Sequence, residues 1–303
     1  MKFDIEKSVN QVVHLKQSDF SLHIKREDLI HPDISGNKYR KLKYNLLEAQ
    51  NQGLKTLVTF GGAFSNHIAA VAAAGQEFGF KTIGVIRGEE VVDKVHDNPT
   101  LRFAKQQGMR FKFVSRADYR LKTTQAFIDA LHNEFGQFYL VPEGGTNALA
   151  VKGCEEILTD TDADFDFVCC AIGTGGTISG LINSSKPNQR VLGFPALKGD
   201  FLNDEIAKFA TKDNWRLISA YHFGGYAKIN DDLISFINAF KQKTNIPLDP
   251  IYTGKMLFGI FDLLDQGFFP KESKILAIHT GGLQGIHGMN ARLKQKQLPT
   301  IDI

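Results

Sequence analysis

Short runs of β-branched and aromatic residues alternate along the chain with segments in which apolar residues recur at helical spacing. Strand-like runs occur in both halves of the chain, at residues 57–60, 82–86, 111–114, 138–141, 165–172, 190–194 and 274–278. Helical patterns lie between several of them, at residues 68–74, 100–107 and 124–135. Strands that alternate with helices form parallel sheets covered on both faces, so the pattern predicts an α/β fold.

The length of 303 residues exceeds that of a typical single domain, so two compact units are expected. No internal repeat, charge run or low-complexity linker marks a boundary between them. The Gly144-Gly145 turn, which follows Pro142 and Glu143, is the best candidate for a crossing from one unit to the other.

Composition and charge restrict the kinds of molecule that the protein is expected to bind. The net charge is only +3 and both signs are interspersed, which argues against nucleic acid or an anionic membrane. The first residues lack the apolar segment of a signal peptide, and no apolar stretch reaches the length of a membrane span, so a cytoplasmic protein is expected. Cys154, Cys169 and Cys170 have no CxxC spacing, and the last two lie in an apolar run, where thiols act as small core residues.

A lysine follows a Ser-Gly-Asn turn at the predicted start of a helix, in Ser35-Gly36-Asn37-Lys38. Asn37 is a candidate N-cap, and Leu42 and Leu46 continue an apolar helical face. Unpaired N–H groups and the positive end of the helix dipole favour the neutral amine of Lys38, which is the form that attacks a carbonyl carbon. The alternative is a solvated lysine in a basic first turn.

Three glycine-rich turns follow strands, at the sheet edge where open parallel sheets bind ligands. The turn at 173–177 enters a helix, and its N–H groups and threonine hydroxyls suit a single phosphate; the alternative is a tight turn that serves only packing. The turn at 61–62 leads to Ser65, Asn66 and His67, which either project into the cleft or cap the helix. The third turn is His279-Thr280-Gly281-Gly282. It points the Thr280 hydroxyl at the same cleft, where a neutral hydrogen-bonding group suits the ring nitrogen of a heteroaromatic cofactor.

One reactive amine, one phosphate site and two polar turns form the set that pyridoxal 5′-phosphate requires. Other chemistries lack their motifs, since the chain has no HExxH, no GxSxG and no Cys/His cluster at zinc spacing. No metal site is expected, and the scattered His279 and His287 are more typical of structural or exposed residues.

In this order along the chain, the motifs resemble those of fold type II pyridoxal-phosphate enzymes, the tryptophan synthase β superfamily. They are most similar to the family of 1-aminocyclopropane-1-carboxylate deaminase and D-cysteine desulfhydrase, from Lys25-Arg26-Glu27-Asp28 to His279-Thr280-Gly281-Gly282. The resemblance implies two domains, each an open, twisted, mostly parallel sheet flanked by helices, with the cofactor in the cleft between them. The smaller domain would comprise residues 41–145, and the larger one residues 1–40 and 146–303. A homodimer is also implied.

The resemblance implies roles for single residues. Lys38 would bind the cofactor covalently and move protons, and Asn66 would bond the pyridoxal 3′-oxygen. Ser65 would contact the substrate carboxylate or act near the α-carbon, beside His67. The phosphate loop corresponds to Gly173, Thr174, Gly175, Gly176 and Thr177.

Two tyrosines and two threonines complete the expected site. Tyr226 and Tyr252 match the active-site tyrosines of the family, the alternative being core aromatics with bonded hydroxyls. Thr253, beside the substrate, and Thr280, beside the ring nitrogen, stand where the deaminases carry glutamate and leucine. A threonine can leave the ring nitrogen neutral, which suffices when Lys38 removes an α-proton and a thiol leaves.

The residues therefore favour a lyase that eliminates the β-substituent of a small D-amino acid, with D-cysteine yielding pyruvate, ammonia and hydrogen sulfide. The alternatives are 1-aminocyclopropane-1-carboxylate deaminase, a deaminase or racemase of another D-amino acid, and a cofactor-binding or metabolite-sensing protein with weak catalysis. Intact Lys38, Ser65, Asn66 and Tyr252 argue against the last of these.

Overall fold

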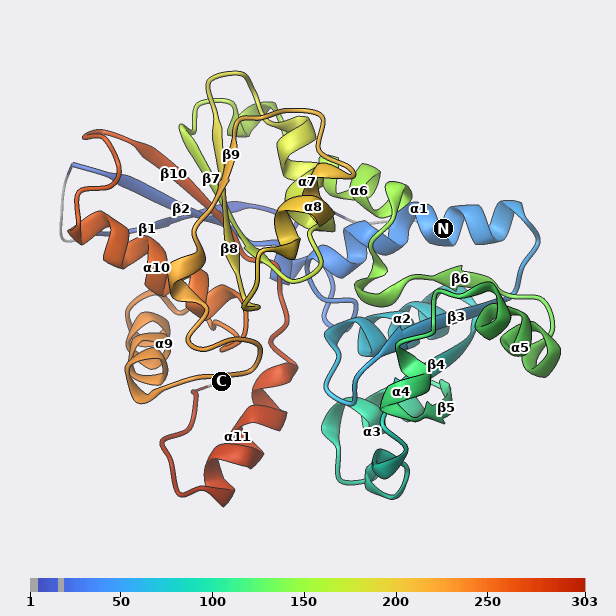
Figure 1. Ribbon diagram of the computed structural model, residues 1–303. Coiled ribbons are helices and arrows are strands. Elements are labelled where there is room, and N and C mark those ends of the chain that lie inside the picture. Colours follow the sequence, from blue (N-terminus) through green and yellow to red (C-terminus); the bar gives the residue numbers. More distant parts are fainter. Residues whose placement is uncertain (1–4, 16–18, 303) are drawn as a thin grey trace.

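The computed structural model describes residues 5–15 and 19–302, and it contains two sheets side by side (Figure 1). The larger sheet has the strand order β1 (Asn10–Val13), β2 (Ser21–Lys25), β10 (Lys274–Ile278), β7 (Phe167–Ile172), β8 (Arg190–Pro195) and β9 (Trp215–Leu217). The smaller sheet has the order β5 (Arg110–Val114), β4 (Lys81–Arg87), β3 (Thr56–Gly61) and β6 (Tyr139–Val141). Among the strands of the described residues only the β1–β2 pair is antiparallel, so the α/β fold with mostly parallel sheets is confirmed.

Helices cover both sheets. The α-helices are α1 (Asn37–Asn51), α2 (Asn66–Phe78), α3 (Pro99–Gln106), α4 (Arg116–Tyr119), α5 (Gln125–Phe135), α6 (Ala148–Glu155), α7 (Gly176–Ser184), α8 (Phe201–Ala207), α9 (Asp231–Thr244), α10 (Thr253–Asp265) and α11 (Gly285–Gln295). Short 3-10 turns are η1 (Glu27–Leu29), η2 (Glu89–Lys94), η3 (Glu143–Gly145), η4 (Asp160–Asp162) and η5 (Ser219–Tyr221). None of the helices in the described ranges combines the length and apolar content that a membrane span requires.

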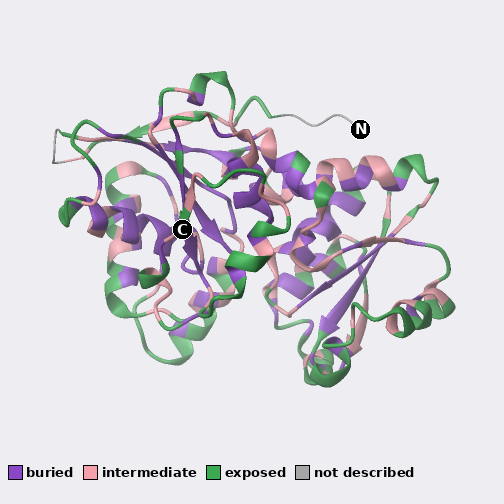
Figure 2. Cartoon of the chain, turned by 45° about the horizontal axis from the view of Figure 1, so that its top comes forward, coloured by how far each residue is buried: buried purple, intermediate pink, exposed green. Residues whose placement is uncertain are grey.

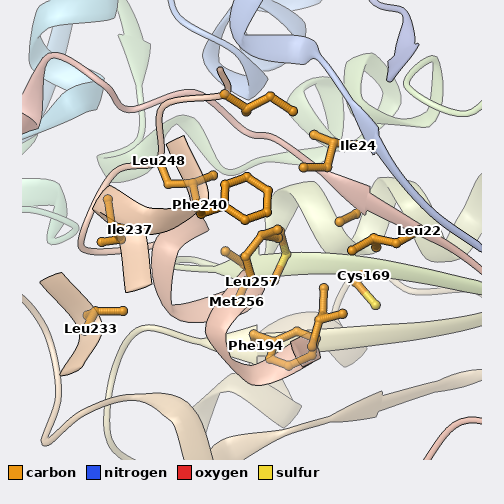
Figure 3. Close-up of a cluster of buried hydrophobic side chains, with 14 of the residues drawn as sticks. Leu22, Ile24, Cys169, Phe194, Leu233, Ile237, Phe240, Leu248, Met256 and Leu257 are labelled. Atoms are coloured by element: carbon orange, nitrogen blue, oxygen red, sulfur yellow. The ribbon is translucent and has the colours of Figure 1, made fainter. Parts of the chain in front are cut away.

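The central strands of the larger sheet are buried on both faces (Figure 2). In β7, Cys169 packs into a cluster with side chains of α9 and α10, which Figure 3 shows, whereas Cys170 packs into a cluster with α7 on the opposite face. Both thiols have no exposed surface, which confirms the expectation that they are core residues. The continuous apolar run in the sequence therefore reflects a strand with helices on both sides.

Helix α1 contacts both halves of the molecule. Gly153 of α6 lies so close to it that a Cβ there would be 2.0 Å from the Arg40 carbonyl oxygen. The apolar face of α1, which includes Leu42 and Leu46, belongs to the same buried cluster as Leu57 of the smaller sheet. The expected boundary at residue 41 falls inside this helix, and the two domain ranges stay a prediction; residues 1–4, 16–18 and 303 of the larger one lie outside the described part.

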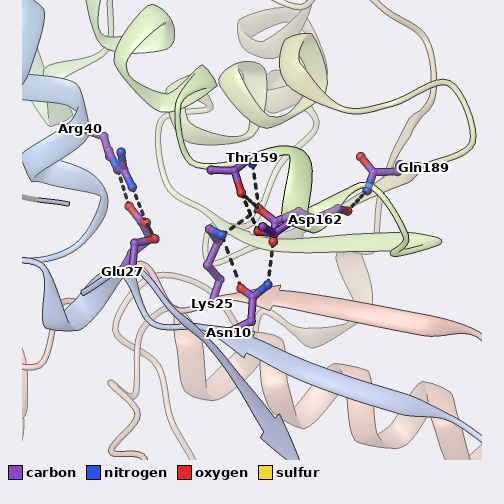
Figure 4. Close-up of polar contacts among 9 residues, drawn as sticks. Asn10, Lys25, Glu27, Arg40, Thr159, Asp162 and Gln189 are labelled. Carbon is purple, nitrogen blue, oxygen red and sulfur yellow. Dashed lines mark hydrogen bonds and ion pairs between the residues drawn. The ribbon is translucent and has the colours of Figure 1, made fainter. Parts of the chain in front are cut away.

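Two buried ion pairs join elements near β2 (Figure 4). One links α1 to η1, which follows β2, and the other links β2 to η4. Glu27, just after β2, accepts two hydrogen bonds from the Arg40 guanidinium, at 2.7 and 2.8 Å. Lys25 donates to Asp162 of η4 at 2.8 Å, and Asn10 of β1 donates to the same carboxylate at 2.7 Å. Because these groups are almost fully buried, each charge depends on its partner for solvation.

Candidate functional site

A cavity of about 340 Å³ lies where the carboxyl ends of strands from both sheets meet. Its walls come from the segments after β3, β4, β6, β7 and β10 and from the start of α1. The lining residues include eleven that the sequence predicted, namely Lys38, Ser65, Asn66, His67, Gly173, Thr174, Gly175, Thr177, Tyr226, Tyr252 and Thr280. The tertiary structure thus brings together motifs separated by more than two hundred positions in the sequence.

Lys38 reaches the cavity from the first turn of α1. The preceding Gly36 has φ +57°, and a Cβ there would be 2.1 Å from the Thr280 carbonyl oxygen, so only glycine allows this approach. Asn37 was expected to cap the helix and does not: it is the first helical residue, and its amide donates to the Thr177 hydroxyl at 2.7 Å. Gly36 is the N-cap because the chain needs a positive φ at that point.

The Lys38 amine is less basic than that of an ordinary lysine. Burial, followed by the charge of Lys41, lowers the pKa of Lys38 to about 7. Within the described part of the chain its Nζ has one weak hydrogen-bond partner, the Asn37 side-chain oxygen at 3.4 Å. A substantial fraction is therefore neutral at physiological pH, as a nucleophilic amine requires. The sequence attributed this effect to the helix terminus, whereas desolvation and a neighbouring cation are the main causes.

The turn after β7 opens α7 and forms a polar cradle, which consists of Lys41, Thr146, Thr174, Thr177 and the first-turn N–H groups of α7. Lys41 Nζ donates to the Thr146 hydroxyl at 3.0 Å and lies 3.4 Å from the Thr174 hydroxyl. A Cβ on Gly176 would come within 2.9 Å of the Thr146 side chain, so the absence of one keeps the cradle open. Helix N–H groups, hydroxyls and the Lys41 amine, to which no carboxylate of the described residues bonds, fit a phosphate ester.

Lys41 and Thr146 were missed by the sequence analysis. Lys41 is 2% exposed, and burial lowers its pKa. Its spacing of three from Lys38 places both amines on one helical face, which was a usable signal. Thr146 gave none, because its position beside Lys41 depends on how α6 packs against α1.

Ser65 and Asn66 lie at the start of α2, where both expected interpretations hold. The Ser65 hydroxyl accepts from the Ile68 N–H at 3.3 Å as an N-cap, and both residues also line the cavity. The Asn66 amide nitrogen lies 2.9 Å from where a Cβ on Gly282 would be, so Gly282 allows this close contact. His67 is 2% exposed, and its Nε2 lies 2.8 Å from the Thr59 hydroxyl. Burial and the two nearby lysines hold the His67 pKa well below its usual value, so the ring is neutral.

Tyr226 and Tyr252 meet across the cavity, with ring centroids 6.3 Å apart. Desolvation of the phenol is the first cause of the raised pKa of each tyrosine, so both phenols stay protonated at neutral pH. Tyr226 is 44% exposed, which excludes the alternative of a core aromatic for this residue. Protonated phenols at this place can donate to a substrate or to a leaving group.

Thr253 was expected to border the substrate, and the structure corrects its placement. It is fully buried and does not line the cavity. Its hydroxyl accepts from the Asp249 N–H at 3.0 Å and donates its one proton to the Asp249 carboxylate at 2.7 Å, so no proton remains for it to donate to a ligand. Asp249 also accepts from the Ile251 and Tyr252 N–H groups, and this turn orients Tyr252 at the start of α10.

Thr280 lines the cavity as expected and is 7% exposed. Its carbonyl oxygen accepts from the Asn37 N–H at 3.2 Å, which ties the β10 edge to the turn that carries Lys38. In the described residues, no group of three or more His, Cys, Asp or Glu side chains could hold a metal ion.

Comparisons with known proteins agree with this chemistry. A model of the family described as "Pyridoxal-phosphate dependent enzyme" matches residues 8–281. A protein of Pyrococcus horikoshii, provisionally named 1-aminocyclopropane-1-carboxylate deaminase, is 30% identical over 287 residues, with 87% of this chain and 85% of the relative covered. A mitochondrial protein of Arabidopsis thaliana, named bifunctional D-cysteine desulfhydrase/1-aminocyclopropane-1-carboxylate deaminase, is 29% identical over 297 residues, with 88% of this chain and 73% of the relative covered.

Solved structures give the same answer for the fold. The crystal structure of an ACC deaminase homologue superimposes with a TM-score of 0.81 at 26% identity, and the match covers 97% of this chain and 95% of that chain.

Proposed function

Since the chain belongs to the family of pyridoxal-phosphate dependent enzymes that includes 1-aminocyclopropane-1-carboxylate deaminases and D-cysteine desulfhydrases, we propose that it is a D-cysteine desulfhydrase. The reaction converts D-cysteine and water to pyruvate, ammonia and hydrogen sulfide. The observation that carries this proposal is the Lys38 amine of depressed pKa, which lines the same cavity as the phosphate-binding cradle and the Ser65-Asn66 turn.

The residues present fit the cofactor. The cradle suits its phosphate, Lys38 suits its aldehyde, and Asn66 and Thr280 offer polar groups to the ring oxygen and ring nitrogen. When bound, pyridoxal phosphate supplies an electron sink for the charge left on the α-carbon. Ser65 and Asn66 would bind a substrate carboxylate, because they lie at the N-terminus of α2.

Proton transfers fall to Lys38 and the tyrosines. As a neutral amine, Lys38 can accept the proton of the α-carbon. The protonated phenols of Tyr226 and Tyr252 can donate toward the departing sulfur. Glu143 is the only carboxylate among the described residues that line the cavity, so the lining offers no carboxylate beside Thr280 to hold a ring nitrogen protonated. This favours α-proton removal over opening of a cyclopropane ring.

The second candidate is 1-aminocyclopropane-1-carboxylate deaminase, because both relatives described above carry that name. The reassigned Thr253 leaves Thr280 as the one threonine at the cavity that distinguishes the two activities. We also propose a homodimer, which size-exclusion chromatography with light scattering would check.

A substrate panel separates the candidates. Holoenzyme would be assayed with D-cysteine, L-cysteine, D-serine and the cyclopropane acid, with keto acid and sulfide measured together. We expect D-cysteine to be the best substrate and to release both products in equal amounts. Keto acid formed fastest from the cyclopropane acid would overturn the proposal.

Lys38→Ala tests the central residue of the proposal. We expect it to abolish turnover and the absorbance of covalently bound cofactor. Lys43→Ala is the matched control, because Lys43 lies on the same helix but bonds to Glu156 outside the cavity. Normal turnover by Lys38→Ala would exclude the role assigned to it.

A further inference from the structure

One cation of the cavity has no role in the chemistry described above. Arg87 is the last residue of β4 and lines the cavity. It is exposed, whereas Lys41 in the cradle is 2% exposed, so Arg87 belongs to the solvent side of the cavity wall. Its Nη2 lies 3.5 Å from where a Cβ on Gly62 would be, directly beside the turn that leads to Ser65.

The charge of Arg87 is uncompensated. Among the described residues it forms no ion pair, and its guanidinium instead lies over the Tyr119 ring, 5.5 Å from the centroid. The acidic residues nearby are already occupied. Glu143 accepts from the Tyr119 hydroxyl at 2.8 Å and pairs with Lys122 at 3.2 Å. Glu90 pairs with Arg116 at 2.6 Å.

The other cations of the cavity are committed. Lys41 donates to the Gly144 carbonyl oxygen and to the Thr146 hydroxyl, and Lys38 is the residue proposed to bind the cofactor. A guanidinium stacked on a tyrosine is held in orientation and presents its remaining N–H groups as a fork that matches a carboxylate or an oxyanion.

We propose that Arg87 is a specificity-determining residue that binds a negatively charged group on the β-carbon of the substrate. The proposal rests on the proposed function for the site but concerns the class of amino acid it accepts. In the proposed function the α-carboxylate binds at the N-terminus of α2, so the side-chain substituent is the group that would face the solvent side of the cavity, where Arg87 lies. Thiolate, sulfinate, carboxylate and phosphate share the required charge.

An isosteric pair of ligands isolates that charge. D-Aspartate and D-asparagine have nearly the same shape and differ in the charge of the side chain. Their binding to the holoenzyme would be measured by calorimetry at low and high salt. We expect D-aspartate to bind about tenfold more tightly at low salt, and the ratio to shrink at high salt, because Arg87 is exposed.

Variants of Arg87 test whether this residue causes the preference for D-aspartate over D-asparagine. In Arg87→Gln we expect the ratio of affinities to fall close to one through loss of D-aspartate affinity alone. Arg87→Lys would retain part of it, since a lysine keeps the charge without the fork. Arg116→Gln is the matched control, an exposed arginine whose guanidinium pairs with Glu90 and does not line the cavity, and it should keep the wild-type ratio.

Several outcomes overturn the proposal. These are a wild-type ratio near one, no saturable binding of D-aspartate, an unchanged ratio in Arg87→Gln, and an equal loss of both ligands in that variant, which would assign Arg87 to the α-carboxylate. D-cysteine turnover measured in parallel distinguishes this failure from that of the proposed function. If the enzyme turns over D-cysteine but binds D-aspartate and D-asparagine equally, only the role of Arg87 is rejected. If it prefers D-aspartate but does not turn over D-cysteine, only the desulfhydrase activity is rejected.

Discussion

Replacing Glu27 by glutamine tests whether a buried ion pair holds the helix that carries the reactive lysine. The Arg40 and Glu27 side chains are 2% and 0% exposed, and two hydrogen bonds join them. The Ser8 hydroxyl also donates to the same carboxylate. In Glu27→Gln the amide of the new side chain faces the guanidinium with a donor in place of one acceptor, and the buried Arg40 charge loses the carboxylate that bonds to it.

The expected cost follows from that burial. Removing one partner of a buried pair destabilises a protein by about 3–5 kcal/mol, far more than the loss of an exposed pair. Urea unfolding followed by circular dichroism would show a lower midpoint with an unchanged slope. Since Arg40 lies two positions after Lys38 on α1, we also expect weaker retention of the cofactor.

The control is Glu134→Gln. The Lys112–Glu134 pair is 31% and 45% exposed, so its loss should cost about 0–1 kcal/mol. Equal costs for the two variants, or a cost below about 1 kcal/mol for Glu27→Gln, would refute the argument that burial of the pair makes it critical.

Three further predictions follow from the same structure. Gly176→Ala should weaken cofactor binding by about tenfold or more in an absorbance titration, because its Cβ would meet the Thr146 side chain at 2.9 Å and Lys41 Nζ at 3.2 Å; unchanged affinity would exclude the cradle as the phosphate site. Cys154, Cys169 and Cys170 are fully buried, and burial raises the pKa of each thiol, so a thiol reagent should modify none of them in the native protein and all three after denaturation. Burial alone would raise the pKa of Asp162, but hydrogen bonds from Asn10 and Lys25 hold it below 3.8. The unfolded chain therefore takes up this proton first as the pH falls, and stability is lost below about pH 4. Urea midpoints of Asp162→Asn should fall less steeply with acid than those of the wild type, and parallel slopes would contradict the prediction.

The strands of the two sheets were largely predictable because their signal is local. β3, β4, β5, β8 and β10 coincide within a residue with the apolar runs that predicted them. β1 and β2 were not predicted, since Gln11 and His23 interrupt their apolar pattern and their pairing partners are distant in sequence. The two-sided burial of β7 was visible as an uninterrupted apolar run, because both of its faces lie against helices.

Within the site, the sequence alone indicated the cofactor, since each motif meets a local requirement. Gly36 permits a positive φ before Lys38, and the turn from Gly173 to Thr177 offers N–H groups at a helix start. These requirements involve neighbours within a few positions, so they are visible without a fold.

Only the tertiary structure decided how those motifs share the cavity. It placed Lys41 in the cradle beside Thr146 and left Arg87 at the cavity wall with no ion pair among the described residues. Each of these depends on contacts between elements far apart in the chain, through the packing of α1 on α6 or the meeting of two sheets. Local sequence carries no information on which distant hydroxyl or carboxylate will accept a given proton, and that choice is what positions the charges around the substrate.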